Sequence, residues 1–454
     1  MNAISSLLNK IQTRKAEVAV LGLGHVGLPT ALIFSRAGFH VTGIDIDETK
    51  VEALTQGNCY VMEPGLQETL ATCLANGSFR ATRDLSNSIK SSQIVSVCVP
   101  TPIEDTLPDL RAFQAALGAV QSNAHKEMMI LIESTLPPRT MSQIVVPELQ
   151  RVGYKVDEEI FIAYCPERIT PVHALEELAS NTRIIGGVGP NSSKIAAEFF
   201  KTVCKQVITT NPLTAEIVKL AENTFRDVNI AYANSLALIA EHLGADVNDV
   251  INLANTHPRV AIHKPGLGVG GPCLPKDPHI LISGVPEDYG QLIRLARKVN
   301  DAMSGHAVSL MAQALKKNGV PIKGAKVTVL GLAYKADTED MTYSPAIPLI
   351  EELVKLGASV TVYDAHVPAV KQLNRVSSIE NALKGADAIV VVTPHPEFRF
   401  IHARFLRSLV GPQCIVFDGP RIFDSAEIEN VGLTYLGTGY SPSGHSRIRA
   451  ASND

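Results

Sequence analysis

A glycine-rich turn between two apolar strands constrains the fold of this chain more than any other feature. The apolar run Val18–Leu21 is followed by G-L-G-H-V-G over residues 22–27, a helical stretch, and a second apolar run, His40–Ile44, that ends in Asp45. In a dinucleotide-binding unit the first glycine makes the tight turn, the second admits the pyrophosphate and the third lets helix and strand pack closely. This order of strand, turn, helix, strand and acidic residue predicts a Rossmann-type unit.

The same unit indicates which cofactor is bound. An acid at the position of Asp45 accepts from the ribose 2′-hydroxyl and would repel a 2′-phosphate, so we expect NAD rather than NADP. Two later strands end in polar turns, V-P-T-P and E-S-T, and ligands bind outside the carboxyl ends of parallel strands. The residues expected to hold NAD are Gly22, Gly24, His25, Val26, Gly27, Asp45, Lys50, Pro100, Thr101, Glu133, Ser134 and Thr135.

The order of apolar runs predicts an α/β chain with two Rossmann-like, doubly wound domains joined by a central helical domain with one long helix. Strands alternate with helices to about residue 208, one helix is expected over 214–244, and a second α/β unit lacks the G-x-G-x-x-G turn. We expect an NAD-binding domain over 1–208, a central helical domain over 209–305 and a second Rossmann-like domain over 306–454. The predicted strands are Val18–Leu21, His40–Ile44, Ile94–Val99, Met129–Glu133, Ile160–Tyr164, Arg183–Gly187, Lys326–Leu330, Ser359–Tyr363, Ala388–Thr393 and Cys414–Asp418.

Composition excludes several classes of protein. A net charge of −4 without a basic cluster argues against a nucleic-acid surface. No apolar stretch reaches the roughly 18 residues that cross a membrane, and Met1–Lys15 is typical of a short amphipathic helix rather than a signal peptide. Seven scattered cysteines without a C-x-x-C pair favour a reducing cytoplasm and argue against structural zinc, so no metal is expected.

A second glycine-rich segment, G-L-G-V-G-G-P-C-L-P-K-D-P over residues 266–278, carries the strongest chemical signal. Glycines let backbone approach a ligand closely, a cation such as Lys276 can lower the pKa of the Cys273 thiol, and Asp277 can act as a base. The alternative interpretation is a buried structural cysteine. Lys219 and Asn223 lie four residues apart on the predicted long helix and share one side of it, although a solvated pair would have the same spacing.

Collinear motifs along residues 16–440 resemble those of the UDP-glucose/GDP-mannose dehydrogenase family, the UDP-sugar 6-dehydrogenases. Besides the glycine turn and the cysteine loop, the motifs are E-P-G-L at 63–66, V-P-T-P at 99–102, E-S-T-L-P-P at 133–138, Y-C-P-E-R at 164–168, R-I-I-G-G at 183–187, K-L-A-E-N at 219–223, A-R-K-V-N-D at 296–301, G-L-A-Y-K at 331–335 and V-Y-D at 362–364.

The resemblance implies a four-electron oxidation of C6 of a UDP-sugar to a carboxylate with two NAD. It implies that Cys273 is the nucleophile, forming a thiohemiacetal and then a thioester. Lys219 and Asn223 would stabilise the oxyanion and a water, Asp277 would take part in proton transfer, and Glu167 would assist hydrolysis. It also implies at least a homodimer, with Arg259 reaching across the interface. The implied substrate contacts are Arg168, Arg259, Lys264, Gly270 and Lys335.

The motifs are most similar to the branch of the family that acts on UDP-N-acetylhexosamines. UDP-N-acetyl-mannosamine is favoured, with UDP-N-acetyl-glucosamine and UDP-glucose as alternatives. The chain departs from the family pattern at Pro171 and Val172, which bear on the sugar, at Arg139 in place of a glycine, and at Thr342 and Pro420-Arg421, which bear on the nucleotide.

Two other classes of protein share parts of this pattern. A single-step dehydrogenase of the 6-phosphogluconate type would need neither Cys273 nor a second α/β domain. A non-catalytic nucleotide-sugar sensor is possible on fold alone, but it would not need Cys273, Lys219, Asn223, Asp277 and Glu167 together.

Overall fold

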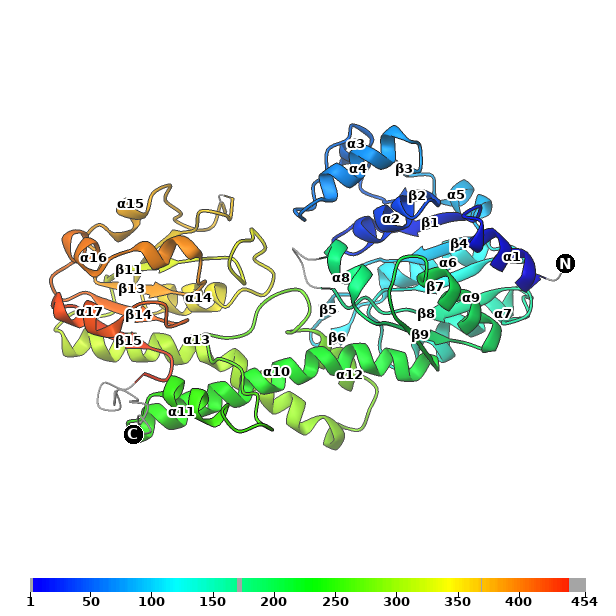
Figure 1. The fold of residues 1–454 in the computed structure, drawn as a ribbon. Helices are drawn as coiled ribbons and strands as arrows, with labels where there is room; N and C mark the ends of the chain where they lie inside the picture. Colours follow the sequence, from blue (N-terminus) through cyan, green and yellow to red (C-terminus); the bar gives the residue numbers. More distant parts are fainter. Residues whose placement is uncertain (1–2, 170–173, 369, 441–454) are drawn as a thin grey trace, which may run out of the picture. The chain divides into compact units, whose positions relative to one another are not determined.

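The structure is a computed structural model that describes residues 3–169, 174–368 and 370–440. It divides into two compact units. The first comprises Met1–Glu222 with His279–Ser283, and the second Asn223–Pro278 with Gly284–Asp454. Each unit contains a mainly parallel sheet with helices packed on it (Figure 1), which confirms the predicted α/β class.

The first unit is built on an eight-stranded sheet in the order β10-β9-β8-β7-β4-β1-β2-β3, and only β8 and β9 pair antiparallel. Its strands are β1 (Glu17–Leu21), β2 (His40–Ile44), β3 (Phe79–Thr82), β4 (Ile94–Val97), β7 (Met129–Ile132), β8 (Phe161–Tyr164), β9 (Arg183–Gly187) and β10 (Val207–Thr210). A hairpin of β5 (Ile103–Glu104) and β6 (Leu107–Pro108) lies apart from the sheet. Its helices are α1 (Ala3–Gln12), α2 (Gly27–Arg36), α3 (Glu48–Thr55), α4 (Leu66–Ala75), α5 (Leu85–Ser91), α6 (Arg111–Asn123), a π-helix (Met141–Val145), α7 (Val146–Arg151), α8 (Ala174–Ser180) and α9 (Pro190–Phe200).

The sheet of the first unit separates two apolar cores. Side chains of a strand alternate between its faces, so Val18 and Val20 of β1 belong to one core and Ala19 and Leu21 to the other. Because both faces are covered, the central strands β4, β7 and β8 are buried along their whole length. Continuous apolar runs of this kind are what made these strands predictable.

Helix α10 (Pro212–Leu243) is 32 residues long and continues from the first unit into the second. It confirms the predicted long helix. A second long helix, α13 (Gln291–Lys317), was not predicted.

The second unit has a five-stranded parallel sheet in the order β12-β11-β13-β14-β15. Its strands are β11 (Lys326–Leu330), β12 (Ser359–Tyr363), β13 (Ala388–Val391), β14 (Ile415–Asp418) and β15 (Thr434–Gly437). The remaining helices are α11 (Val247–Ala254), α12 (Asp277–Ile282), η2 (Glu287–Gly290), α14 (Ala346–Lys355), α15 (Ile379–Leu383), η3 (Pro396–Phe400), α16 (Ala403–Leu409) and α17 (Ser425–Asn430).

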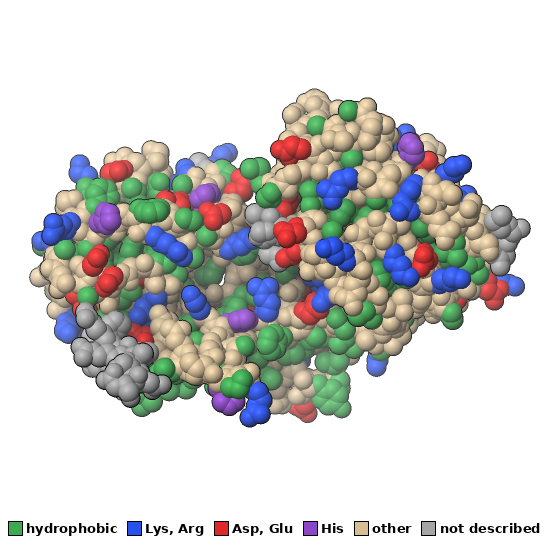
Figure 2. Space-filling view, in the orientation of Figure 1, with side chains coloured by type: hydrophobic (Ala, Val, Ile, Leu, Met, Phe, Trp, Pro, Cys, Tyr) green, Lys and Arg blue, Asp and Glu red, His purple; other side chains and the backbone are tan. Residues whose placement is uncertain are grey.

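Acidic and basic side chains are interspersed on the face of the molecule shown in Figure 2. Within the described residues, no helix combines the length and the apolar character that a membrane span requires.

Candidate active site

The turn between β1 and α2 has the geometry of a dinucleotide-phosphate cradle. Gly22 adopts φ +88°, and a Cβ there would lie 2.6 Å from the carbonyl oxygen of Cys98. A Cβ on Gly27 would lie 1.8 Å from the Gly22 oxygen, whereas one on Gly24 would meet no described atom within 4 Å. The first and third glycines therefore allow close packing and the second faces open space, as the pyrophosphate requires. No side chain of the described residues caps the N-terminus of α2, which leaves its first turn available to an anion.

Asp45, predicted to bind the adenosine ribose, is hydrogen-bonded to this turn. Its Oδ2 accepts from the N–H of Leu23 at 2.8 Å and its Oδ1 from the N–H of Asp47 at 3.0 Å. Lys50 Nζ lies 3.8 Å from Asp45 Oδ2. Each carboxylate oxygen has two lone pairs, so these backbone contacts orient Asp45 and leave it able to accept from a ribose hydroxyl.

Replacing Asp45 with alanine is therefore expected to weaken NAD binding selectively. A hydrogen bond to a charged group contributes about 1.5–3 kcal/mol, so the KM for NAD should rise about tenfold to a hundredfold. The ratio of activity with NADP to activity with NAD should rise as well. Steady-state kinetics with both cofactors measure this, and an unchanged KM for NAD would contradict the assignment.

The turns that follow β4 and β7 are hydrogen-bonded to each other. Thr101 Oγ1 donates to the Thr135 carbonyl at 2.7 Å, and Ser134 Oγ donates to the Val99 carbonyl at 2.7 Å. Pro100 is exposed beside them. The two polar turns therefore form one continuous border at the carboxyl ends of β4 and β7, where the sequence predicts the cofactor.

Glu133 differs from the other residues of this border. The sequence places it beside the cofactor, but its carboxylate is buried and forms an ion pair with Arg183. Its second oxygen accepts from Ser96 Oγ at 2.5 Å. The Arg183 guanidinium also donates to the Cys165 carbonyl at 2.7 Å and lies over the Phe200 ring. The Glu133 side chain thus supports the turn from the core below it, and a contact of Glu133 with the cofactor stays a prediction.

Glu167 and Lys219 face each other within the first unit. Lys219 lies on α10, and its Nζ is 3.8 Å from Glu167 Oε2. Next to them, Arg168 forms a bidentate pair with Glu222, with Nε to Oε2 at 3.0 Å and Nη2 to Oε1 at 2.5 Å. The Arg168 side chain, predicted to contact substrate, is engaged by Glu222 and by the Thr182 carbonyl.

The cysteine loop lies within the second unit. The N–H groups of Lys276 and Asp277 donate to the Cys273 carbonyl, which forms the turn that begins α12. The buried Asp277 carboxylate accepts from Asn223 Nδ2 at 2.7 Å and pairs with Lys276 Nζ at 3.0 Å. Asn223, Lys276 and Asp277 thus form a hydrogen-bonded cluster beside half-buried Cys273.

Two glycines of this loop, Gly270 and Gly271, are required by Tyr334, a residue that sequence reasoning did not single out. A Cβ on Gly271 would lie 2.7 Å from the Tyr334 ring, and one on Gly270 would lie 2.8 Å from Tyr334 Cβ. The N–H of Gly271 also donates to the Thr342 carbonyl at 2.8 Å. Burial, together with the nearby Asp340 and Cys273, raises the pKa of Tyr334 to about 12, so the phenol stays neutral beside the thiol. Its place in G-L-A-Y-K, next to Lys335, was the only sequence signal.

The second α/β unit holds its strand-end acid differently from the first. Asp364, which follows β12, accepts from the N–H groups of Leu332 and Ala333 and pairs with His395 Nε2 at 3.1 Å. Burial alone would raise the pKa of Asp364, but the bonds from His395 and these backbone groups outweigh it and lower the pKa. Because Asp364 is fully buried, it fixes the loop that carries Lys335 rather than offering itself to a ribose.

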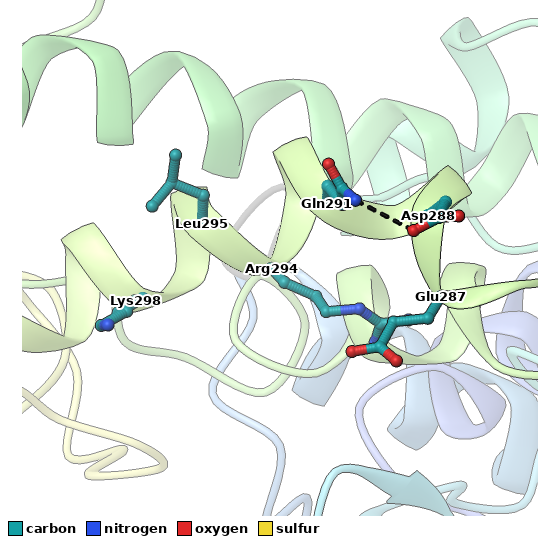
Figure 3. Close-up of a pocket in the computed structure, with 6 residues that line it drawn as sticks. All are labelled: Glu287, Asp288, Gln291, Arg294, Leu295 and Lys298. Carbon is teal, nitrogen blue, oxygen red and sulfur yellow. Dashed lines mark hydrogen bonds between the residues drawn. The ribbon is translucent and has the colours of Figure 1, made fainter.

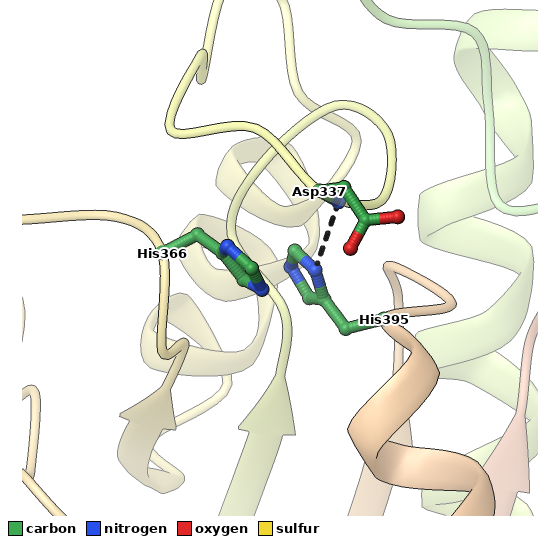
Figure 4. A group of neighbouring side chains, drawn as sticks. All are labelled: Asp337, His366 and His395. Carbon is green, nitrogen blue, oxygen red and sulfur yellow. Dashed lines mark hydrogen bonds between the residues drawn. The ribbon is translucent and has the colours of Figure 1, made fainter. Parts of the chain in front are cut away.

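Asp337, His366 and His395 come together beside this loop, as Figure 4 shows. Their arrangement does not suit a shared metal ion. The His366 and His395 rings are stacked 4.5 Å apart at an interplanar angle of 14°. Imidazole lone pairs lie in the ring plane, so two parallel rings cannot direct them at one ion. His395 Nδ1 also accepts from the N–H of Asp337 at 3.3 Å.

The structure also describes the surroundings of several other residues that the sequence analysis singled out. Arg259 and Lys264 are exposed, and Lys335 is half-buried with its Nζ 5.8 Å from the Tyr334 ring centroid. Arg139 adopts φ +76°, a conformation that favours the glycine it replaces. Arg421 is held by Asp246 at 2.8 Å, and Pro171 and Val172 lie outside the described residues.

A cavity of about 310 Å³ lies at the start of α13 and is lined by none of the predicted site residues (Figure 3). Its lining carries charges of both signs, and Gln291 Nε2 donates to Asp288 Oδ1 at 3.1 Å. The residues that line it are Glu287, Asp288, Gln291, Arg294, Leu295 and Lys298.

Comparison with known proteins shows that one family matches all three parts of this chain. The chain matches the NAD binding domain of the UDP-glucose/GDP-mannose dehydrogenase family over residues 16–204, its central domain over 213–302 and its UDP binding domain over 328–425. The chain belongs to the UDP-glucose/GDP-mannose dehydrogenase family. The predicted family and the predicted cofactor of this dehydrogenase, NAD, are both confirmed.

Three relatives illustrate the range of this dehydrogenase's family. A protein of Pyrococcus horikoshii described as UDP-N-acetyl-D-mannosamine dehydrogenase is 39% identical over 93% of this chain and 99% of its own. The structure of the UDP-ManNAc dehydrogenase from that organism has a TM-score of 0.89, covering 95% of this chain and all of the other. An NDP-N-acetyl-D-galactosaminuronic acid dehydrogenase of Ralstonia nicotianae is 35% identical over 87% of this chain and 94% of its own. A UDP-glucose dehydrogenase structure from Pyrobaculum islandicum is 26% identical, with a TM-score of 0.82 over 94% and 98% of the two chains.

Proposed function

We propose that this dehydrogenase oxidises C6 of UDP-N-acetyl-mannosamine to the uronate in two steps that share one cysteine. The single observation that carries the proposal is the hydrogen-bonded cluster of Asn223, Lys276 and the buried Asp277 in the same loop as a half-buried Cys273. The cluster places a cation and a carboxylate in the same loop as the thiol, and the glycines of this loop expose backbone to a ligand.

The proposed chemistry follows from these groups. Bound NAD supplies a hydride acceptor for each oxidation. After C6 is oxidised to the aldehyde, the Cys273 thiolate adds to the carbonyl carbon and forms a thiohemiacetal. Loss of a second hydride converts the thiohemiacetal to a thioester. Water then adds to the thioester carbon and the carbon–sulfur bond breaks, which releases the uronate and restores the Cys273 thiolate.

The roles of the neighbouring residues follow from their charge. Lys219 and Asn223 donate hydrogen bonds to the oxygen that becomes negative when sulfur or water adds. They lie one turn apart on α10, a rise of about 6 Å. Asp277 transfers protons, and Glu167 accepts the proton of the hydrolytic water.

The other six cysteines support the choice of Cys273 as nucleophile. Burial raises the pKa of each of their thiols, in the case of Cys414 to about 12. A thiol with a raised pKa is protonated at neutral pH and is a poor nucleophile. These cysteines are Cys59, Cys73, Cys98, Cys165, Cys204 and Cys414.

The identity of the sugar rests on the Y-C-P-E-R motif, on T-H-P-R-V at residues 256–260, and on the similarity to the UDP-N-acetyl-D-mannosamine dehydrogenase of Pyrococcus horikoshii. Lys335 is proposed to contact the uridine nucleotide, and Arg259, Lys264 and Gly270 the sugar or diphosphate. We propose domains 1–208, 209–305 and 306–454 for NAD binding, dimerisation and UDP-sugar binding. A cytoplasmic location is proposed, because a catalytic thiol needs reducing surroundings.

The proposed substrate is tested by comparing UDP-N-acetyl-mannosamine, UDP-N-acetyl-glucosamine, UDP-N-acetyl-galactosamine and UDP-glucose in an assay of NADH formation. The kcat/KM for the mannosamine derivative should exceed the others by about tenfold or more. Preference for another of these sugars would keep the chemistry and overturn the substrate. No NADH with any UDP-sugar would overturn the function.

The proposed dimer rests on an apolar stripe along α10. Phe225, Tyr232, Ile239 and Leu243 are all more than half exposed, at 62%, 55%, 53% and 73%. Spacings of seven, seven and four residues place them on one face of the helix. An exposed apolar stripe of this length is typical of a protein interface, and we propose that a second copy of this chain covers it.

Replacing Tyr232 and Ile239 together with glutamate should break the proposed dimer. Glutamate is a good helix former, so α10 itself should persist while like charges meet at the interface. Light scattering after size exclusion should give the mass of a dimer for the parent and of a monomer for the variant. Phe400→Glu, at a residue 76% exposed outside the stripe, is the matched control and should leave the mass unchanged. A monomeric parent would contradict the proposal.

A further inference from the structure

Two ion pairs of opposite polarity join the loop after β8 to one face of α10. The loop supplies the consecutive residues Glu167 and Arg168, and the helix supplies Lys219 and Glu222, which are three residues apart and so lie on the same side. Glu167 faces Lys219 and Arg168 faces Glu222. A shift of the loop by one residue would bring like charges together, so the charge pattern specifies a single register.

The two pairs differ in geometry. The inner pair is nearly buried, with side chains 11% and 7% exposed, and its atoms are 3.8 Å apart, longer than a hydrogen bond. The outer pair is partly exposed, at 27% and 38%, and has the short bidentate geometry of a guanidinium and a carboxylate. The contacts that fix the orientation of the loop on the helix are therefore those of the outer pair, Arg168 with Glu222.

Arg168 is anchored on a third side as well. Its Nη1 donates to the Thr182 carbonyl at 2.6 Å, and its own carbonyl accepts from Asn181 Nδ2 at 3.0 Å. Side chain and backbone of Arg168 are thus both fixed to the segment that precedes β9. These contacts make Arg168 suited to hold the loop in place.

We infer that Arg168 and Glu222 are positioning residues that hold the Glu167 carboxylate over Lys219 for thioester hydrolysis. The inference rests on the function proposed above. An exposed ion pair contributes only about 0–1 kcal/mol to stability, so removing it should leave the protein folded. A displacement of about 1 Å at a reacting group, however, lowers a rate by up to about a hundredfold.

Arg168→Ala, Glu222→Ala and the exchanged pair Arg168→Glu with Glu222→Arg test this role. In each single variant, rapid mixing should show the first turnover of NADH at a rate within about threefold of the parent. Steady-state kcat should fall about tenfold or more, and mass spectrometry should detect enzyme carrying the uronyl group on Cys273. The exchanged pair should recover most of the loss. Lys126→Ala, which removes the ion pair with Glu159, is the control and should behave as the parent.

Three outcomes would overturn the inference while leaving the proposed function intact. The first is a kcat within twofold of the parent in both single variants. The second is an equal loss in the first-turnover rate and in steady-state kcat that the exchanged pair does not restore, because a merely structural role would produce that result. The third is a raised KM for the UDP-sugar in Arg168→Ala alone, which would make Arg168 a substrate contact. A parent enzyme that reduces no NAD would instead overturn the proposed function.

Discussion

Replacing Cys273 with serine is expected to lower steady-state turnover about a thousandfold or more, the order of loss seen when a nucleophile is removed. A serine hydroxyl is not ionised at neutral pH, so even beside Lys276 and Asp277 it is a much weaker nucleophile than a thiolate. The Asn223, Lys276 and Asp277 cluster does not depend on the sulfur atom, so the fold should persist. NADH formation with the UDP-sugar measures the loss, and thermal unfolding checks the fold.

Cys59→Ser is the matched control for this substitution, because Cys59 is also half-buried and its thiol pKa is raised by burial. It should retain the activity of the parent. A Cys273→Ser variant as active as the parent, or a Cys59→Ser variant that loses activity equally, would contradict the role of Cys273.

Replacing Arg183 with methionine is expected to lower the free energy of unfolding of the first unit by about 3–5 kcal/mol. The substitution leaves the Glu133 carboxylate buried without its cationic partner, and breaking a buried ion pair costs about that much. Denaturant unfolding measures the change. Adding Glu133→Gln should restore part of the stability, because the remaining buried group is then neutral.

Arg151→Met provides the comparison, since Arg151 pairs with Glu148 on the surface of α7. Its loss should change the free energy of unfolding by less than about 1 kcal/mol. Equal effects of the Arg151 and Arg183 substitutions would contradict the importance of burial for the Glu133–Arg183 pair.

The sequence predicted those parts of the fold that have a strong local pattern. The central strands of both sheets are continuous apolar runs, and the predicted β2, β9, β11 and β12 agree with the structure at both ends. The missed strands β3, β10 and β15 lie at edges of the two large sheets, and the missed β5 and β6 form a separate two-stranded sheet. An edge strand is covered on fewer sides, so short mixed sequences such as V-I-T-T of β10 carry little apolar signal.

The candidate site was predictable only as a set of motifs. The glycine turn, Asp45, Cys273 and the Lys219–Asn223 spacing are local signals, and their chemistry could be read from residue types. The pairs that fix the site join residues far apart in the chain: Arg168 with Glu222 is a separation of 54 residues, and Arg183 with Glu133 a separation of 50. No local pattern tells which charged residues meet, or that Glu133 turns toward the core while Ser134 beside it bonds the neighbouring turn.

The stoichiometry of NADH to UDP-sugar tests the central claim most directly. A limiting amount of UDP-N-acetyl-mannosamine, consumed to completion with excess NAD, should give two NADH and one uronate per sugar. One NADH per sugar with release of the aldehyde would contradict the shared cysteine mechanism and favour a single-step dehydrogenase.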